Sequence, residues 1–285
     1  MNNLIIIKSP KNLGFCGGNN LGFKYAKGQY IVLLNQDTWV DRHWLENLVK
    51  DAENHADVAI FQSKILYPDG KIRTFGNLLD IYGMFACRKR YKNDLGQYDN
   101  DCYSFFYASG ASILIRSDFF ESIGGFDEKL FMYADDIDIC WIARLKGFKI
   151  KLTPSSICYH LNGEFLSITP KKFYFMSRNR IRILIKNYSI YNAMKRVPIA
   201  ILLIGISAIF LTLKKRDPKY LWMYIKALSW NLKNLRNTLS YRKKIQLQRK
   251  IKDNEIEKYM IKYPLELFYY PKIIKRVSST KDGRI

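Results

Sequence analysis

The sequence of 285 residues predicts an α/β fold with a mostly parallel sheet, followed by a helical region that associates with membranes. Strand-like and helix-like segments alternate near its start. Residues 30–34 (Tyr-Ile-Val-Leu-Leu) have the continuous apolar character of a strand buried on both faces. Charge is uneven: residues 1–170 hold 19 Lys+Arg and 19 Asp+Glu, whereas residues 171–285 hold 28 and 6. We therefore expect two domains, residues 1–170 and residues 171–285.

The first domain opens with strands and helices in alternation. Strands are predicted at residues 4–7, 30–34 and 58–62, and helices near residues 20–26 and 41–54. Gly28 is expected to end the first helix as a C-cap. Ligands of open α/β sheets bind beyond the carboxyl ends of strands, and Asp37 follows such an end. Topology therefore predicts that Asp37 lies at a binding site, with an ordinary turn aspartate as the alternative.

The second half of this domain contains more irregular segments. Residues 67–105 are rich in Gly, Asp, Asn and Tyr, which is typical of hairpins and loops. Residues 107–115 form a small-residue turn that leads into a strand. Helices are predicted at residues 117–123 and 136–146, the second capped by Gly147, and strands at residues 149–152 and 157–160. The last of these ends at His160, which is either a structural histidine or a metal ligand.

Three carboxylates are crowded into four residues, Asp135, Asp136 and Asp138. One interpretation is that Asp135 or Asp136 caps the helix that follows, since carboxylates favour helix N-termini. The other is a site that accepts a proton from a hydroxyl or binds a divalent cation beside a diphosphate. Mutual repulsion would raise the pKa of Asp136, which suits a base. Asp37, the pair Asp135-Asp136 and His160 can be assembled into one constellation, in which carboxylate plus imidazole is a plausible set of ligands for Mn²⁺ or Mg²⁺.

The basic C-terminal region contains two apolar stretches. Residues 197–213 are 17 residues without charge between basic flanks, and residues 220–232 are interrupted only by Lys226. At about 1.5 Å per residue, the first barely reaches the roughly 30 Å of a bilayer core. We expect both to be helices that lie in or dip into a membrane surface at its cytoplasmic face; a helical hairpin packed on the globular part is the alternative. The basic residues flank apolar runs and form no polar stripe, so nucleic acid is not the expected partner. Five Cys without a Cys-x-x-Cys pair suggest neither a zinc site nor disulfides, as in a reducing cytosol.

The ordered motifs resemble those of the family 2 inverting glycosyltransferases, closest to their rhamnosyltransferase-like branch, with a GT-A fold. The resemblance covers roughly residues 5–190. It rests on Asn12-x-Gly14-Phe15-x-Gly17-Gly18-Asn19-Asn20, Leu33-Leu34-Asn35-Gln36-Asp37-Thr38, Ser109-Gly110-Ala111, Gly124-Gly125-Phe126-Asp127-Glu128, Asp135-Asp136-Ile137-Asp138 and His160. Each piece is weak alone, and their order makes the set specific.

The resemblance implies a role for each matched residue. Asn35-Gln36-Asp37 stands at the family's Asp-x-Asp motif, so Asp37 would bind the cation that bridges the donor diphosphate, and His160 would complete the metal site. Asp136 would be the catalytic base, and Asp135 replaces the usual Glu beside it. Arg178 resembles a residue that would contact the diphosphate. The donor side would comprise Asn12, Gly14, Gly18, Asn20, Asn35, Asp37 and Arg178, and the acceptor side Gly110, Ala111 and Glu128.

The resemblance also implies a reaction and its partners. An acceptor hydroxyl, deprotonated by Asp136, would attack the anomeric carbon opposite the nucleotide, with Mn²⁺ or Mg²⁺ stabilising the departing diphosphate. The donor would be a nucleotide sugar carrying a hexose or deoxyhexose. The acceptor would be a glycan or a polyprenyl-phosphate-linked glycan at an anionic membrane surface, to which the basic region would bind.

The resemblance implies that the N-terminus is incomplete. The family opens with a strand, a helix and a second strand before the Asn12 segment, a unit on the order of 30 residues. Its absence would leave residues 4–7 as an exposed edge strand. A misassigned start, a separately encoded N-terminal fragment, or an inactive remnant would each explain it. The alternative function is therefore an inactive or split-gene partner at the membrane that needs a separate nucleotide-binding part.

Overall fold

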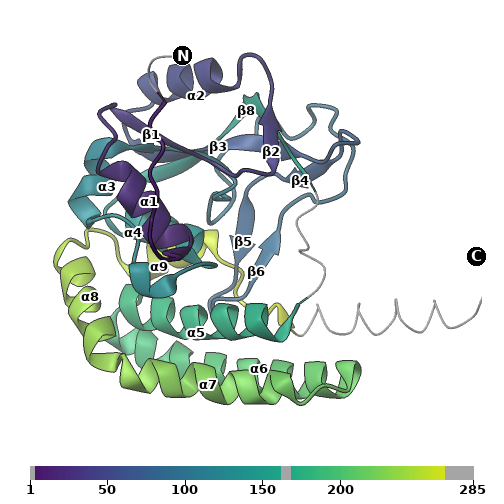
Figure 1. Ribbon diagram of the computed structural model, residues 1–285, viewed down its shortest axis with the longest axis vertical. Coiled ribbons are helices and arrows are strands. Elements are labelled where there is room, and N and C mark those ends of the chain that lie inside the picture. The colour runs from purple at the N-terminus through teal and green to yellow at the C-terminus, as the bar shows by residue number, and fades with distance from the viewer. Residues whose placement is uncertain (1–3, 162–167, 267–285) are drawn as a thin grey trace, which may run out of the picture. The chain divides into compact units, whose positions relative to one another are not determined.

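The computed structural model describes residues 4–161 and 168–266, which divide into two compact units (Figure 1). The first unit comprises residues 1–76 and 89–166, and the second comprises residues 77–88 and 167–285. The division at residues 166 and 167 lies near the predicted boundary at residue 170. Residues 77–88, however, belong to the second unit, although they lie within the range predicted for the first domain.

The first unit is built on a six-stranded sheet with the order β1-β7-β3-β8-β2, and β4 pairs with β3. The strands are β1 (Tyr30–Leu34), β2 (Thr38–Val40), β3 (Val58–Leu66), β4 (Ile72–Thr74), β7 (Ser112–Arg116) and β8 (Lys149–His160). The helices are α1 (Gly14–Phe23), α2 (Trp44–Glu53), α3 (Ser117–Ile123) and α4 (Asp135–Leu145), with a 3₁₀ turn at Glu128–Leu130.

The prediction of a mostly parallel sheet is wrong, because the sheet is mixed. β3 and β8 form the one parallel pair among the strands that the structure describes, and β7 runs antiparallel to both of its neighbours, β1 and β3. β1 and β3 do run in the same direction, as the strand–helix–strand order predicts. A later strand is inserted between them, and local sequence order does not reveal such an insertion.

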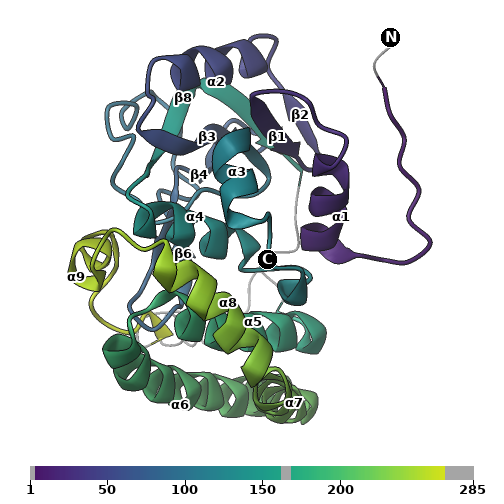
Figure 2. The ribbon, with the colours of Figure 1, turned by 90° about the vertical axis from the view of Figure 1, so that its left-hand side faces the viewer.

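The sheet carries helices on both faces, with α2 on one side and α4 on the other (Figure 2). Trp44 and Leu48 of α2 pack on Phe61 and Leu114 in one apolar cluster. On the other side, the Trp141 ring of α4 meets the Phe106 ring edge-on, with 5.4 Å between centroids. β3 is buried along its whole length, as a strand covered on both faces must be.

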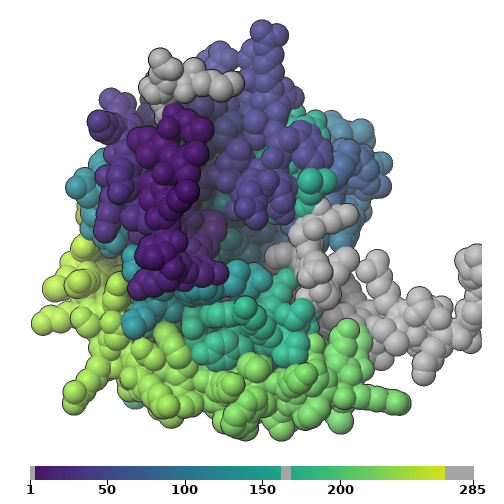
Figure 3. Space-filling view, viewed as in Figure 1, coloured from purple at the N-terminus to yellow at the C-terminus, as the bar shows by residue number. Residues whose placement is uncertain are grey.

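The start of the chain differs from the prediction. Residues 4–7 form no strand, and the side chains of Leu4, Ile5 and Ile6 are 80%, 62% and 76% exposed. The N-terminal residues before α1 overlap the body in the view of Figure 3, but the turned view of Figure 2 shows them standing clear of it. β1 pairs only with β7 in the described part of the sheet, and its burial alternates, so it is not buried on both faces. A strand needs a neighbour for its backbone hydrogen bonds, and residues 4–7 lack one.

Two further boundaries differ. α1 begins at Gly14 and ends at Phe23, so Gly28 does not cap it. The strands predicted at residues 149–152 and 157–160 are one strand, β8, whose pairing with β3 shifts between Ser63 and Lys64. Such a bulge absorbs the extra residues around Pro154 without ending the strand.

The second unit is mostly helical and contains one small hairpin. Its elements are β5 (Asn77–Leu79), β6 (Phe85–Cys87), α5 (Pro170–Asn187), α6 (Ile190–Lys215), α7 (Lys219–Lys233), α8 (Leu235–Leu247) and α9 (Asp253–Ile256), followed by a 3₁₀ turn at Glu257–Tyr259. The hairpin bonds to the end of the described chain: Ile81 N donates to Ile261 O at 3.0 Å, and Leu265 N donates to Asp80 Oδ2 at 2.7 Å. The two predicted apolar stretches lie within α6 and α7, so their helical character is confirmed.

Candidate active site

Strand pairing brings Asp37 and His160 together. β2 and β8 are antiparallel, with Thr38 opposite His160, so the residue before Thr38 lies beside the imidazole. His160 Nε2 and Asp37 Oδ2 are 2.9 Å apart. The Asp37 side chain is 43% exposed, whereas that of His160 is 9% exposed. The pair therefore presents a carboxylate to solvent in front of a buried imidazole.

Arg73 fixes the end of β8 from behind and was not predicted from the sequence. Its Nη1 donates to the carbonyl oxygens of His160 (3.3 Å) and Leu161 (2.7 Å), while Leu161 N donates to Asp37 O at 3.0 Å. Burial, reinforced by the Arg73 charge, lowers the pKa of His160, so its imidazole is neutral at pH 7 and keeps a nitrogen lone pair. The signal that could have identified Arg73 is its position between Ile72 and Thr74, as a charged residue in the middle of the short, buried strand β4.

Asp37 and His160 suit a divalent cation whose other ligands come from the substrate. Within residues 4–161 and 168–266, no three His, Cys, Asp or Glu side chains gather closely enough to hold a metal ion. One carboxylate oxygen and one imidazole nitrogen are nonetheless enough for Mg²⁺ or Mn²⁺ when phosphate oxygens and water complete the coordination. Asp37 and His160 would hold such an ion.

The acidic cluster opens α4 without capping it. Ala134 occupies the N-cap position with φ of +62°, and no side chain caps the helix there. Asp136 instead accepts two backbone hydrogen bonds, from Ile137 N to Oδ1 (2.9 Å) and from Gly110 N to Oδ2 (3.4 Å). The capping interpretation therefore does not describe Asp135 or Asp136.

The electrostatics of the cluster differ from the prediction in their cause. Burial raises the pKa of Asp136 to about 6, against the effect of the hydrogen bonds from Gly110 and Ile137. Crowding acts on Asp135 instead: burial, together with the charges of Asp136 and Asp138, raises its pKa to about 8. Both carboxyl groups therefore hold a proton more tightly than an exposed aspartate does, and Asp135 does so more strongly than Asp136. The two adjacent carboxyl groups are thus suited to different tasks.

The loop at residues 109–111 connects the two acidic positions. Gly110 N bonds to Asp136, and the carbonyl oxygen of Ala111 accepts from Asn35 N (3.0 Å), two residues before Asp37. Buried Gln62, also missed at the sequence level, holds the loop by accepting from Ser109 N at 2.7 Å. A Cβ on Gly110 would lie 3.4 Å from the Phe15 ring and 3.8 Å from Asp136 Cβ. These are ordinary van der Waals contacts, so the loop has room for a Cβ at this position.

Several predicted donor and acceptor residues bind one another. Asn20 Nδ2 donates to Phe126 O (2.9 Å) and to Glu128 Oε1 (3.2 Å), while Asn20 Oδ1 accepts from Phe126 N. Asn12 Oδ1 accepts from Gly14 N at 2.8 Å. Gly14 has φ of +68°, and a Cβ there would collide with Phe131 O at 2.3 Å. These contacts hold α1 against residues 124–131, which lead into the acidic cluster.

The remaining two predictions fall outside this group. Gly18 lies on the exposed side of α1, where a Cβ would meet no atom within 4 Å. Arg178 belongs to the second unit, where its guanidinium lies 4.3 Å from the centre of the Trp230 ring and 4.8 Å from that of Phe175. Its contact with a donor diphosphate stays a prediction.

The structure thus combines a mixed sheet, helices on both its faces and carboxylates beyond its strand ends. Residues 2–124, which are less than half of the chain, match the model of the family "Glycosyl transferase family 2".

Curated relatives and solved structures show further similarity. The chain is 26% identical over 149 residues to the O-antigen biosynthesis protein RfbC of Myxococcus xanthus, covering 50% of this chain and 12% of that protein. It is 26% identical over 210 residues to poly-beta-1,6-N-acetyl-D-glucosamine synthase of Staphylococcus aureus (strain COL), covering 71% and 47%. The chain thus spans less than half of either relative.

Two crystal structures show weaker likeness. GalNAc-T7 with UDP, GalNAc and Mn²⁺ has 16% identity and a TM-score of 0.48, covering 63% of this chain and 37% of that chain. S. aureus TarS 1-349 in complex with UDP-GlcNAc has 14% identity and a TM-score of 0.47, covering 82% and 72%.

Proposed function

We propose that the protein transfers a hexosyl or deoxyhexosyl group from a nucleotide sugar to a glycan or lipid-linked acceptor, with inversion. The observation that carries this proposal is that one loop, residues 109–111, connects half-buried Asp136 with the Asp37–His160 pair. Gly110 N bonds to Asp136, and the carbonyl oxygen of Ala111 accepts from Asn35 N, two residues before Asp37. The names of the two curated relatives both concern polysaccharides, which favours a glycan product. A rhamnosyltransferase-like specificity is the finer form of the same proposal.

Asp136 would act on the acceptor, whereas Asp37 and His160 would act on the donor. Asp136 accepts the proton of the acceptor hydroxyl, and its pKa of about 6 leaves it ionised near neutral pH while keeping it a useful base. Asp135, beside it, favours its neutral form and so adds little negative charge against the incoming oxygen. Asp37 and His160 would hold Mn²⁺ or Mg²⁺, which supplies positive charge to the leaving diphosphate.

Calorimetry with UDP- and GDP-sugars, in Mn²⁺ and then in EDTA, tests donor binding. We expect binding that requires the cation, because Asp37 and His160 would hold it in the described part of the chain and the donor diphosphate would supply further oxygen ligands. Transfer is then measured with the donor that binds. Binding of none of these donors with Mn²⁺ would contradict the proposal.

The same measurement addresses a second candidate function, a non-catalytic partner that requires a separately encoded N-terminal fragment. The specific observation in its favour is the apolar run at residues 4–7, which is exposed while β1 pairs on one side only. This reading predicts no donor binding by the chain alone, and its recovery when the fragment is added.

We also propose that the second unit binds the cytoplasmic face of an anionic membrane. α6 is long and apolar enough to cross a bilayer, with a mean hydropathy of 2.3 over its most apolar window, 33% of which is buried. Its inner face packs through Ile204, Ala208 and Leu211. Its outer face stays exposed, with Leu202, Ile206 and Ile209 at 63%, 50% and 53%, and α7 adds Trp222 at 54%. A hairpin that only packs on protein would not need this second apolar face.

Flotation with vesicles of phosphatidylcholine and phosphatidylserine tests this attachment. Leu202→Asn together with Ile209→Asn should release the protein from the vesicles, since both side chains lie on the outer face of α6. Leu45→Asn with Leu95→Asn is the matched control, because these residues are also exposed and apolar but lie in the first unit. Recovery of the unmodified protein entirely in the soluble fraction at physiological salt would refute membrane attachment.

A further inference from the structure

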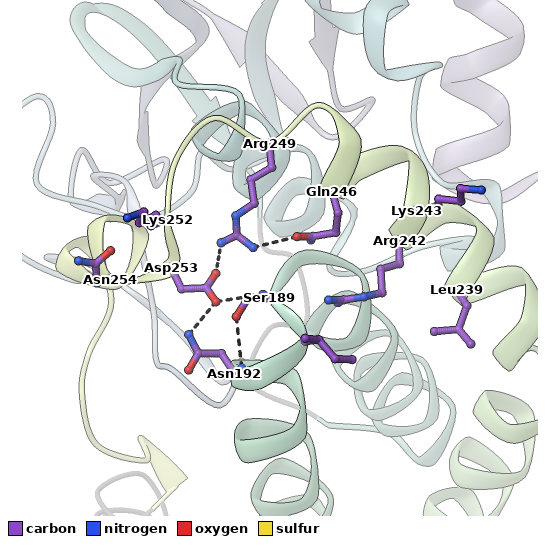
Figure 4. A pocket seen from close by; sticks show the side chains of 11 residues that line it. Ser189, Asn192, Leu239, Arg242, Lys243, Gln246, Arg249, Lys252, Asp253 and Asn254 are labelled. Carbon is purple, nitrogen blue, oxygen red and sulfur yellow. Dashed lines mark hydrogen bonds and ion pairs between the residues drawn. The ribbon is translucent and has the colours of Figure 1, made fainter.

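A cavity of about 740 Å³ lies within the second unit and is rich in positive charge (Figure 4). It is lined by the start of α6, one face of α8 and the segment before α9. Its charged lining residues are four cations and one carboxylate, namely Arg242, Lys243, Arg249, Lys252 and Asp253. None of these residues has a role in the sugar transfer proposed above.

The single carboxylate is already engaged. Asp253 Oδ2 accepts from Ser189 N (2.9 Å) and Asn192 Nδ2 (2.6 Å), and Oδ1 pairs with the guanidinium of Arg249. Figure 4 shows these bonds converging on Asp253. Asp253 therefore balances Arg249 and leaves the other three cations of the cavity without a compensating carboxylate in its lining.

The three other cations are held differently. Arg242 is fixed, because its Nη1 donates to the carbonyl oxygens of Ile185 (2.5 Å) and Tyr188 (2.6 Å) at the end of α5. In Figure 4 its guanidinium points toward Ser189, and Lys243 and Lys252 lie at opposite ends of the lining, here called its rim, with their nitrogens directed outward. Both lysines are exposed and form no ion pair within the part of the chain that the structure describes. One hydrogen-bonded cation and two exposed cations thus belong to the lining of the same cavity.

The neighbouring helix end adds to this preference for anions. α6 starts at the cavity, and its first turn contains no acidic residue. Asp253 is the one carboxylate of the lining that faces the positive end of the helix dipole. Exposed apolar side chains follow immediately along α6: Ile190, Tyr191 and Met194 are 64%, 72% and 73% exposed. A phosphate group with an attached hydrocarbon chain would satisfy both features.

We propose that this cavity binds a phosphate group, either on a lipid headgroup or free in solution, with Arg242 as the fixed donor and Lys243 and Lys252 closing over it from the rim. The proposal is independent of sugar transfer and of the identity of the donor. It adds a defined headgroup contact to a surface that would otherwise bind membranes only through apolar contact and diffuse charge.

The experiment compares two double variants of the full chain with equal charge. Lys243→Gln with Lys252→Gln removes the rim cations, and Lys244→Gln with Lys250→Gln removes two exposed neighbours outside the cavity lining. Calorimetry with inorganic phosphate measures the free source. Flotation with phosphatidylcholine vesicles, with or without phosphatidic acid, measures the lipid source. Thermal melting verifies that both variants are folded.

We expect the rim variant to bind about tenfold more weakly than the control variant, because each lost lysine removes a charge-assisted contact with phosphate. Loss of inorganic phosphate binding in the rim variant alone supports the proposal with a free ligand as the source. Loss of phosphatidic acid-dependent flotation in that variant alone supports it with a lipid as the source. Equal behaviour of the two variants, or no binding of either probe by the unmodified protein, would overturn it.

Discussion

Asp136→Asn is expected to lower the turnover of sugar transfer by about 10²–10⁴-fold, to the level of background, without unfolding the protein. The amide keeps the shape of the carboxylate, and its one oxygen can still accept the 2.9 Å hydrogen bond from Ile137 N. The longer bond from Gly110 N, at 3.4 Å, is lost because the second oxygen becomes an NH2 group. It cannot take the proton of the acceptor hydroxyl. Initial rates with saturating donor and acceptor, beside a melting curve, measure the effect.

Two comparisons make this result specific to the base. Asp118→Asn, an exposed position at the start of α3, should leave turnover unchanged. Asp135→Asn should cost much less than Asp136→Asn near pH 7, because burial and the charges of Asp136 and Asp138 already favour the neutral form of Asp135 by raising its pKa. Near-normal turnover in Asp136→Asn would eliminate Asp136 as the base.

The pH dependence of the unmodified protein follows from the same assignment. A base must be ionised, and the pKa of Asp136 is raised to about 6 by burial. Activity should therefore be retained at pH 7 and fall as the pH drops through 6, about tenfold per unit below that value. A profile of kcat/KM that stays flat down to pH 5 would contradict the raised pKa.

Asp37→Asn is expected to weaken cation-dependent donor binding by at least about 100-fold, since loss of an outer-shell partner alone costs about 10–100-fold. Asp37 offers the exposed carboxylate of the site, and a neutral amide oxygen is a much poorer ligand for Mn²⁺. Calorimetry with a nucleotide sugar, with and without Mn²⁺, measures the change.

The control for this variant is Asp41→Asn, an exposed aspartate four residues along the same segment. It removes the same charge without touching His160. His160→Ala should also weaken Mn²⁺-dependent binding, whereas binding measured in EDTA should be the same in all the variants. Equal donor affinities for Asp37→Asn and Asp41→Asn in Mn²⁺ would show that Asp37 holds no cation.

The sequence predicted the bounds of single helices better than it predicted which strands lie next to one another. α3 was predicted at its exact bounds and α4 within one residue, because apolar spacing and the glycines that follow are local signals. The antiparallel insertion of β7 between β1 and β3 is a contact between distant segments, and periodicity carries no information about it. The strand predicted at residues 4–7 does not form for the same reason, since apolar character alone cannot supply a pairing partner.

The candidate site shows the same division. Asp37, Asp136 and His160 could be selected because charged residues after apolar runs stand out, and the strand register then explains why two of them touch. Arg73 and Gln62 support the site from inside buried strands, where a single polar residue gives no periodic signal. Asn20 and Glu128 were assigned to opposite substrates, yet they bond directly, which only three-dimensional packing could reveal.

The packing of residues 77–88 in the second unit has a consequence for the folding of the chain. Ile81 N donates to Ile261 O, and Ile261 N donates to Leu79 O. Asp80 accepts from Leu265 N, which lies 185 positions further along the chain. During synthesis the hairpin emerges from the ribosome long before its bonding partners exist, and contacts of such long sequence separation form slowly. A fragment that stopped at residue 170 would expose this hairpin permanently, so the first unit and the second are best expressed as one polypeptide.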